Sequence, residues 1–307
     1  MTRFSILIPI YNRLQITRQG LSALSKAIDR YGATGQGKCQ FDIVVIDDGS
    51  TDGSSGWIAE NYPSVHLLQG TGDLWWSGAT NLGARYALEQ LNSDYILLWN
   101  DDIAPDDSYF LEVEKVFSYH DFSRTVIGSK IVLTSTGKTW SIGGYFTKWG
   151  KYGMYNDPGG NSKDFFECDW LPGMGTFVPA SVMKDKKIYW NEKQFPQYHG
   201  DSDFTLRCKE NGFEVKTCLN LIIHNASENS RPGGHKNLKA LWWSLTSMRS
   251  NYNFKKRLTF YNQHGVLPFS YWGLAQAYTS FIGYFFKRHI FKIPKKNTGF
   301  FDLSKAK

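Results

Sequence analysis

The strongest constraint on this sequence is the regular alternation of short apolar runs and helix-like segments in its first hundred residues. Residues 4–10, 41–47, 65–70 and 94–100 each have the apolar character of a buried strand. Segments with helix-capping residues and helical periodicity lie between them. Strands and helices in this order predict right-handed crossovers and a mostly parallel sheet, so we expect an α/β fold.

In a parallel sheet the loops that follow the strands meet at one edge, and ligands bind there. The loops expected at this edge read IYNR, IDDGSTD, GTGDLWW and NDDIAPDD, and three of the four carry acids. Asp101 and Asp102 follow a buried strand directly, and two such carboxylates suit a divalent cation that shares a substrate diphosphate. Asp52, Asp106 and Asp107 are expected to cap helices instead.

Other nucleotide-binding classes lose support because their loops are missing. The first strand is followed by YNR rather than by G-x-G-x-x-G, and the chain contains no Walker A sequence. The four cysteines form no C-x-x-C pair, and the first apolar run is too short for a secretory signal. We therefore expect reduced thiols and a cytoplasmic protein.

Five stretches carry a resemblance to a known family. In chain order they read SILIPIYNR, IVVIDDGSTDGS, SGATNLGARYAL, YILLWNDDI and HGDSDFTLRCKENGFEV. Over residues 3–225 the chain resembles a family 2 glycosyltransferase, most of all the bacterial surface-polysaccharide enzymes that include the rhamnosyltransferase-like branch. The resemblance implies the GT-A fold, a Rossmann-like nucleotide-binding mixed sheet flanked by helices. It also implies inverting, metal-dependent transfer of a hexosyl or deoxyhexosyl group.

The resemblance assigns residues to the nucleotide sugar one position at a time. Asp48 matches the acid that accepts a hydrogen bond from the base, and its alternative role is that of a turn residue. Asn81 matches the asparagine of the third loop, where Thr80 replaces the preceding arginine of many relatives. Gly173 matches the segment beneath the donor sugar, or else marks a bulge in an edge strand. The other residues expected to contact the nucleotide sugar are Pro9, Tyr11, Asn12 and Asp101.

The resemblance also implies a metal site and a general base. Residues 100–102 match the DXD element with Asn100 in place of its first acid, so Asp102 becomes the expected ligand of Mn²⁺ or Mg²⁺. His224 is a second candidate ligand, with an ordinary core histidine as the alternative. Asp201 matches the aspartate of the family's ED pair. Because an inverting displacement needs one base near the attacking hydroxyl, Asp201 is the expected catalytic residue, although it could serve only as a helix cap.

The net charge of +7 could favour nucleic acid, anionic lipid or a phosphorylated substrate. Basic and aromatic residues gather after residue 231, and the chain contains no nucleic-acid-binding motif, so nucleic acid is not expected. The uncharged segment 265–286 is long enough to span a bilayer, but its proline and polar residues favour an aromatic helix in the interface. Packing of that helix on the catalytic domain or on another subunit is the alternative.

These observations predict three parts: residues 1–105 for the nucleotide sugar, 106–230 for the acceptor, and 231–307 as a helical, basic and aromatic extension. The expected function is transfer of a sugar from a UDP- or dTDP-linked donor to a hydroxyl of a lipid-linked saccharide, in bacterial cell-surface polysaccharide synthesis. The expected location is the inner face of the cell membrane. The alternative is a catalytically silent nucleotide-sugar-binding or scaffolding subunit. A nucleotidyltransferase would need a basic triphosphate loop, for which Arg13 alone is thin support.

Overall fold

The computed structural model describes residues 1–159, 164–226 and 237–289. The chain forms two compact units, one from residues 1–144 and 154–229, the other from residues 145–153 and 230–307. The first unit therefore contains residues 1–105 and most of residues 106–230, the parts expected to bind the nucleotide sugar and the acceptor. The second takes in a short central segment together with the C-terminal part.

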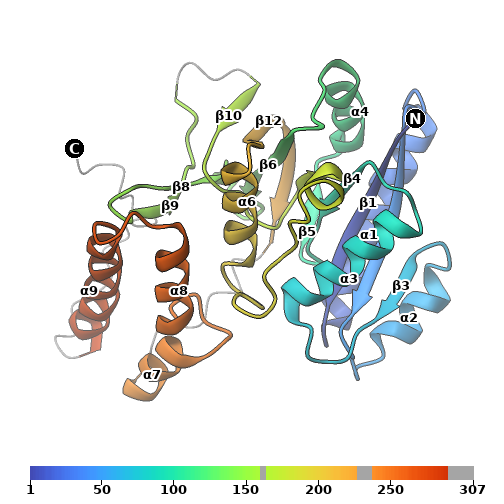
Figure 1. The fold of residues 1–307 in the computed structure, drawn as a ribbon. Coiled ribbons are helices and arrows are strands. Elements are labelled where there is room, and N and C mark those ends of the chain that lie inside the picture. Colours follow the sequence, from blue (N-terminus) through green and yellow to red (C-terminus); the bar gives the residue numbers. More distant parts are fainter. Residues whose placement is uncertain (160–163, 227–236, 290–307) are drawn as a thin grey trace. The chain divides into compact units, whose positions relative to one another are not determined.

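The first unit is built on one mixed sheet (Figure 1), in which the described strands follow the order β10-β12-β6-β11-β4-β1-β2-β3. Two further strands lie off this path, because β5 pairs with β12 and β7 pairs with β6. The strands are β1 (Thr2–Ile10), β2 (Cys39–Asp47), β3 (His66–Gln69), β4 (Tyr95–Leu98), β5 (Ile103–Pro105), β6 (Thr125–Leu133), β7 (Thr139–Ser141), β10 (Phe165–Glu167), β11 (Thr176–Pro179) and β12 (Glu214–Asn225). The four strands predicted from the first hundred residues are parallel to one another, as expected.

Six helices of the described residues belong to this unit: α1 (Leu14–Thr34), α2 (Ser54–Asn61), α3 (Trp75–Glu89), α4 (Tyr109–Tyr119), α5 (Ser181–Lys184) and α6 (Gly200–Glu210). The central strand β1 is buried on both faces over most of its length, which is why residues 6–10 are apolar without interruption. Side chains of α1 and α4 share one hydrophobic cluster with Phe4, Ile6 and Ile8 of β1. Side chains of α3 and α6 pack on the opposite face, where Leu7 lies.

The second unit combines the hairpin of β8 (Gly144–Phe146) and β9 (Tyr152–Met154) with α7 (Leu238–Thr246), α8 (Phe254–His264) and α9 (Ser270–His289). Its core is aromatic: the Tyr252 and Phe281 rings stack at 3.9 Å between centroids, and the Tyr261 hydroxyl donates a hydrogen bond to the Gly150 carbonyl. Within the described residues, no helix combines the length and the apolar character that crossing a membrane requires.

One helix start differs from the sequence prediction. We expected the third helix to begin near residue 78, but α3 begins at Trp75, whose φ of +57° is left-handed. The cause lies outside the helix, because the carboxylate of Asp48 accepts hydrogen bonds from the backbone N–H groups of Leu74 and Trp75. A contact with another loop thus sets where this helix starts.

Close packing of α1 against the end of β4 depends on a glycine. A Cβ atom added to Gly20 would overlap the carbonyl oxygen of Asp101. The helix can therefore cross the loop that carries the two acids only if this position has no side chain.

We expect Gly20→Ala to lower the free energy of unfolding by about 1–3 kcal/mol, because the overlap forces α1 away from the backbone of Asp101. Urea unfolding followed by circular dichroism measures this change. Gly32→Ala in the same helix is the matched control: a Cβ there meets nothing within 4 Å, so we expect stabilisation by about 0.4–1 kcal/mol. Equal effects of both substitutions would contradict the packing argument.

Candidate active site

The carboxyl ends of the parallel strands form one edge of the sheet. Ile10 at the end of β1 pairs in register with Asp47 of β2, which in turn pairs with Gln69 of β3. On the other side of β1, Leu7 pairs with Leu98 of β4. The loops after these four strands therefore lie along one edge, as the sequence predicted.

The first two loops are tied to each other by hydrogen bonds. The Asn12 side-chain oxygen accepts from the backbone N–H of Thr51 at 2.7 Å, and the Asn12 N–H donates to the Ser50 hydroxyl at 2.9 Å. Asn12 itself has a φ of +50° and bends the chain just after β1, which contains Pro9 and ends at Ile10. Tyr11 is 44% exposed beside this turn, so its ring is accessible to a ligand.

Asp48 is buried and organises the third loop. Its Oδ1 accepts from the Gly72 N–H, and its Oδ2 accepts from those of Leu74 and Trp75, all three at 2.9 Å. Three backbone donors satisfy the charge that burial would otherwise penalise. Oδ1 accepts one of these hydrogen bonds and a carboxylate oxygen can accept two, so the predicted contact with a base is chemically compatible with this arrangement.

Asp101 and Asp102 share one cationic partner. Arg13 Nη1 lies 3.0 Å from Asp101 Oδ1, and Arg13 Nη2 lies 3.0 Å from Asp102 Oδ2. The Thr17 hydroxyl donates to Asp101 Oδ2 at 2.9 Å. Burial raises the pKa of Asp101 to about 6, although the guanidinium acts in the opposite direction. The sequence analysis did not place Arg13 at the acids; an arginine directly after the first strand, on the acidic edge, was the available signal.

Asp201 lies in the first turn of α6 and is bound to a second segment of the site. Its Oδ1 accepts from the Ser202 N–H at 2.8 Å, and its Oδ2 accepts from the Gly173 N–H at 3.1 Å. Burial raises the pKa of Asp201 above its usual range, while the backbone hydrogen bonds lower it. Gly175, two residues beyond Gly173, donates to the Leu98 carbonyl at the end of β4. The 173–175 segment thus connects Asp201 to the strand that leads into the acids.

Trp76 forms a wall beside Gly173. A Cβ atom on Gly173 would overlap the Trp76 indole, and one on Gly200 would overlap the Ser77 hydroxyl. Both glycines therefore allow the start of α3 to approach the segments that position Asp201. The sequence analysis placed the GTGDLWW loop at this edge but did not single out Trp76.

Two predicted residues have partners that the sequence did not indicate. Asn81 is buried and exchanges hydrogen bonds with the backbone of Trp190, and its amide nitrogen also donates to Glu192. His224 Nε2 lies 3.3 Å from Asp106 Oδ2. Elsewhere on α6, Arg207 forms an ion pair with Asp203 at 2.7 Å.

The residues present can hold a divalent cation only in a limited way. Across the described parts of the chain, no group of three or more His, Cys, Asp and Glu side chains is placed to hold a metal ion. However, Asp101 and Asp102 already hold one cationic group in common. Mg²⁺ typically needs one or two protein carboxylates when a substrate diphosphate supplies further oxygens. The acid pair therefore fits a cation shared with a diphosphate, rather than a site made of protein ligands alone.

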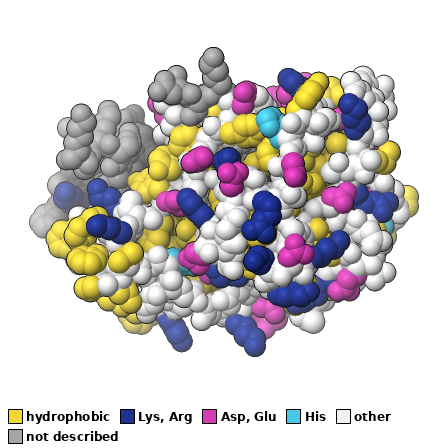
Figure 2. All heavy atoms as spheres, turned by 45° about the horizontal axis from the view of Figure 1, so that its top comes forward, with side chains coloured by type: hydrophobic (Ala, Val, Ile, Leu, Met, Phe, Trp, Pro, Cys, Tyr) yellow, Lys and Arg dark blue, Asp and Glu magenta, His cyan; other side chains and the backbone are white. Residues whose placement is uncertain are grey.

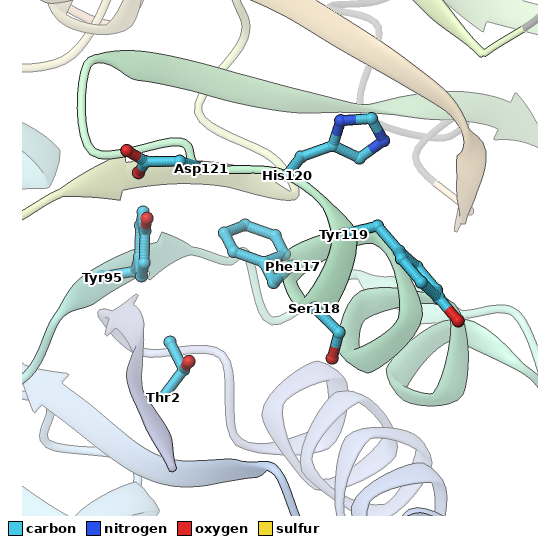
Figure 3. A pocket seen from close by; sticks show the side chains of 7 residues that line it. All are labelled: Thr2, Tyr95, Phe117, Ser118, Tyr119, His120 and Asp121. Carbon is cyan, nitrogen blue, oxygen red and sulfur yellow. The ribbon is translucent and has the colours of Figure 1, made fainter.

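A separate hollow lies at the other end of the same strands (Figure 3). It has a volume of about 380 Å³ and is lined by Thr2, Tyr95, Phe117, Ser118, Tyr119, His120 and Asp121. Thr2 and Tyr95 begin β1 and β4, whereas the acids follow the carboxyl end of β4. This hollow is therefore distinct from the candidate active site.

Comparison with protein families decides the class of the protein. The model of glycosyl transferase family 2 matches residues 5–171, more than half of the chain. The chain belongs to glycosyl transferase family 2. A relative of this glycosyltransferase is the low-salt glycan biosynthesis hexosyltransferase Agl10 of Haloferax volcanii, which is 22% identical over 187 residues. The match covers 60% of this chain and 59% of Agl10, so the chain spans less than two thirds of that relative.

Solved glycosyltransferase structures share the fold. Residues 1–349 of S. aureus TarS match with a TM-score of 0.52 and 14% identity, over 86% of this chain and 72% of that one. GalNAc-T7, crystallised with UDP, GalNAc and Mn²⁺, matches with a TM-score of 0.57 and 11% identity, over 91% and 58% of the two chains. The family 2 glycosyltransferase thus has the predicted GT-A fold.

Proposed function

We propose that this family 2 glycosyltransferase is an inverting, metal-dependent enzyme. It transfers a hexosyl or deoxyhexosyl group from a UDP- or dTDP-linked donor to a hydroxyl of a lipid-linked saccharide, in bacterial surface-polysaccharide synthesis. The observation that carries the proposal is the Asp101–Asp102 pair, held by one cationic group on the sheet edge that also carries Asp48. The complex of GalNAc-T7 with UDP, GalNAc and Mn²⁺ is consistent with this chemistry.

The donor half of the site would hold the nucleotide by its base and its diphosphate. The free acceptor capacity of Asp48 Oδ1 suits the imide N–H of a uracil or thymine base, and the exposed ring of Tyr11 can lie against that base. Asp102, with Asp101 beside it and His224 as a candidate further ligand, would hold a divalent cation. When bound, that cation would neutralise charge that develops on the leaving diphosphate.

The acceptor half would move one proton. The acceptor hydroxyl oxygen forms a bond to the anomeric carbon of the donor sugar while the bond from that carbon to the diphosphate oxygen breaks. Asp201 takes the hydroxyl proton, which requires its ionised form. The Gly173 and Ser202 N–H groups keep the carboxylate oriented, and its raised pKa makes it a stronger base than an exposed aspartate.

The first test is thermal stabilisation by UDP-, dTDP- and GDP-sugars, each with Mn²⁺ or with EDTA. We expect a metal-dependent rise in Tm for one nucleotide, and Asp102→Ala should abolish that dependence and lower donor hydrolysis or transfer about 10²-fold or more. Asp107→Ala is the matched control, since this exposed acid pairs with Arg30. No shift with any donor in folded protein would contradict the proposal and favour the silent nucleotide-sugar-binding subunit.

Asp201→Asn should lower kcat about 10²–10⁴-fold and leave donor affinity nearly unchanged, because the variant keeps the shape of the side chain but cannot accept the proton. In the unsubstituted enzyme, kcat/KM should rise with pH and inflect above the usual aspartate range, since burial raises the pKa of Asp201. Steady-state kinetics from pH 4 to pH 8, roughly, measures both. Asp169→Asn, a surface acid paired with Lys209, serves as the control. Full transfer by Asp201→Asn would assign the base elsewhere.

Peripheral membrane contact is the last part of the proposal, and it rests on the second unit alone. Five exposed apolar side chains, here called the aromatic turn cluster, come from the turn between α8 and α9 (Val266, Leu267 and Phe269), the first turn of α9 (Trp272) and the β8–β9 turn (Trp149). The Trp149 and Phe269 rings are in contact at 5.1 Å, and Trp272 is 62% exposed. No Asp or Glu occurs between residues 229 and 301. Figure 2 shows hydrophobic side chains with Lys and Arg among them at the left edge of the molecule. An apolar surface among cations suits an anionic bilayer.

We expect the double substitution Phe269→Ser, Trp272→Ser to lower partitioning onto vesicles of phosphatidylglycerol and phosphatidylethanolamine at least about tenfold, because each large apolar side chain contributes about 1.5–3 kcal/mol when buried. Co-sedimentation measures this partitioning. Tyr119→Ser, at an exposed aromatic residue of the first unit, is the control. Absence of binding by the unsubstituted protein would exclude this contact.

A further inference from the structure

Arg13 is the only cationic group that the described residues bring to the acid pair, and it contacts both acids at once. Its two terminal nitrogens each contact a different carboxylate, Asp101 and Asp102, at 3.0 Å. The Arg13 side chain is 37% exposed, whereas that of Asp101 is almost wholly buried. The guanidinium therefore covers the acids from the accessible side.

This arrangement leaves few carboxylate oxygens for another cation. Arg13 holds Asp101 Oδ1 and Asp102 Oδ2, and the Thr17 hydroxyl holds Asp101 Oδ2. A metal ion that took the oxygens held by Arg13 would be brought against a guanidinium of the same charge sign. Like charges at contact distance repel strongly where water is scarce, so the metal ion and the guanidinium compete for the acids.

Hydrogen bonds of the residues on either side hold the backbone at Arg13, whereas the Arg13 side chain is partly exposed to solvent. Residue 12 is tied to Thr51, and the Leu14 N–H donates to Asp52 Oδ2 at 2.8 Å. Arg13 thus belongs to an anchored turn directly before α1. From this turn its side chain extends to the two acids. A long side chain on a fixed base can change partner by rotation about its own bonds. A guanidinium forms its strongest paired hydrogen bonds with carboxylates and phosphates.

We propose that Arg13 is an exchangeable counter-ion of the donor site: it neutralises Asp101 and Asp102 in the free protein and transfers to the donor diphosphate when a divalent cation takes the acids. The inference rests on the proposed metal-dependent function and adds a consequence to it. The cation and the nucleoside diphosphate bind synergistically. The cation releases Arg13 from the acids so that Arg13 can bind the diphosphate, and the diphosphate holds Arg13 away from the acids that bind the cation. Neither acid is then left unpaired at any stage, which matters because an unpaired buried carboxylate is strongly destabilising.

Titration of Mn²⁺ alone, followed by electron paramagnetic resonance, tests the competition without any turnover. We expect Arg13→Ala to bind Mn²⁺ at least about fivefold more tightly than the unsubstituted protein in the absence of nucleotide, the lower end of typical coupling between sites. Arg13→Lys keeps the charge but cannot bridge two carboxylates, and we expect an intermediate affinity. Arg18→Ala removes the same charge from the helix that follows, where Arg18 lies over the Trp57 ring, and should leave Mn²⁺ affinity unchanged.

A second titration with saturating UDP tests the transfer. UDP should raise Mn²⁺ affinity about 5–150-fold in the unsubstituted protein and much less in Arg13→Ala, whose affinity for UDP should also fall. Unchanged or weaker Mn²⁺ binding by Arg13→Ala without UDP, in protein shown to be folded, would overturn the exchange while leaving the proposed function intact. Failure of every variant to bind Mn²⁺, even with UDP, would instead reject metal dependence itself.

Discussion

Parallel pairing of β1 with β2 and β4 is the constraint on which the rest of the first unit depends. β1 is the central strand of this part of the sheet and is buried on both faces, so its buried side chains are apolar except that of Ser5, whose hydroxyl is hydrogen-bonded to the Ser93 hydroxyl. Its partners end at nearly the same level, which brings their loops together at the carboxyl edge. The polar side chains of these loops are thereby gathered at one edge of the sheet, where helices α1 and α3 begin.

The negative charges of acids gathered at such an edge must be stabilised by hydrogen-bond donors or cations, and the acids of this site have different partners. Asp48 is neutralised by three backbone N–H groups, and the Asp101–Asp102 pair by one guanidinium. Asp201 receives two N–H groups, yet burial still raises its pKa. Burial raises the pKa of Asp101 as well, to about 6, but Asp101 has the Arg13 guanidinium beside it, whereas the hydrogen bonds to the Asp201 carboxylate come from neutral backbone N–H groups.

Much of this could be predicted from the sequence. The four strands, the helices between them and the GT-A fold were expected, and the loops that carry Asp48, Asp101 and Asp102 lie at the predicted edge. Contacts between distant segments could not be predicted in the same way. Asn81 meets Trp190, 109 residues further on, and His224 meets Asp106, 118 residues earlier. These side chains have partners that no local pattern indicates.

The sequence by itself determined the elements and the edge, because hydrophobic periodicity and strand order depend on neighbouring residues and on sterics that hold for any chain. The tertiary structure alone decided which partner each acid has. Arg13 reaches Asp102 across 89 residues, and Gly20 lets α1 approach the backbone of Asp101. The physical reason is that a hydrogen bond or an ion pair depends on distances of a few ångströms, which only the packed arrangement of helices and strands fixes.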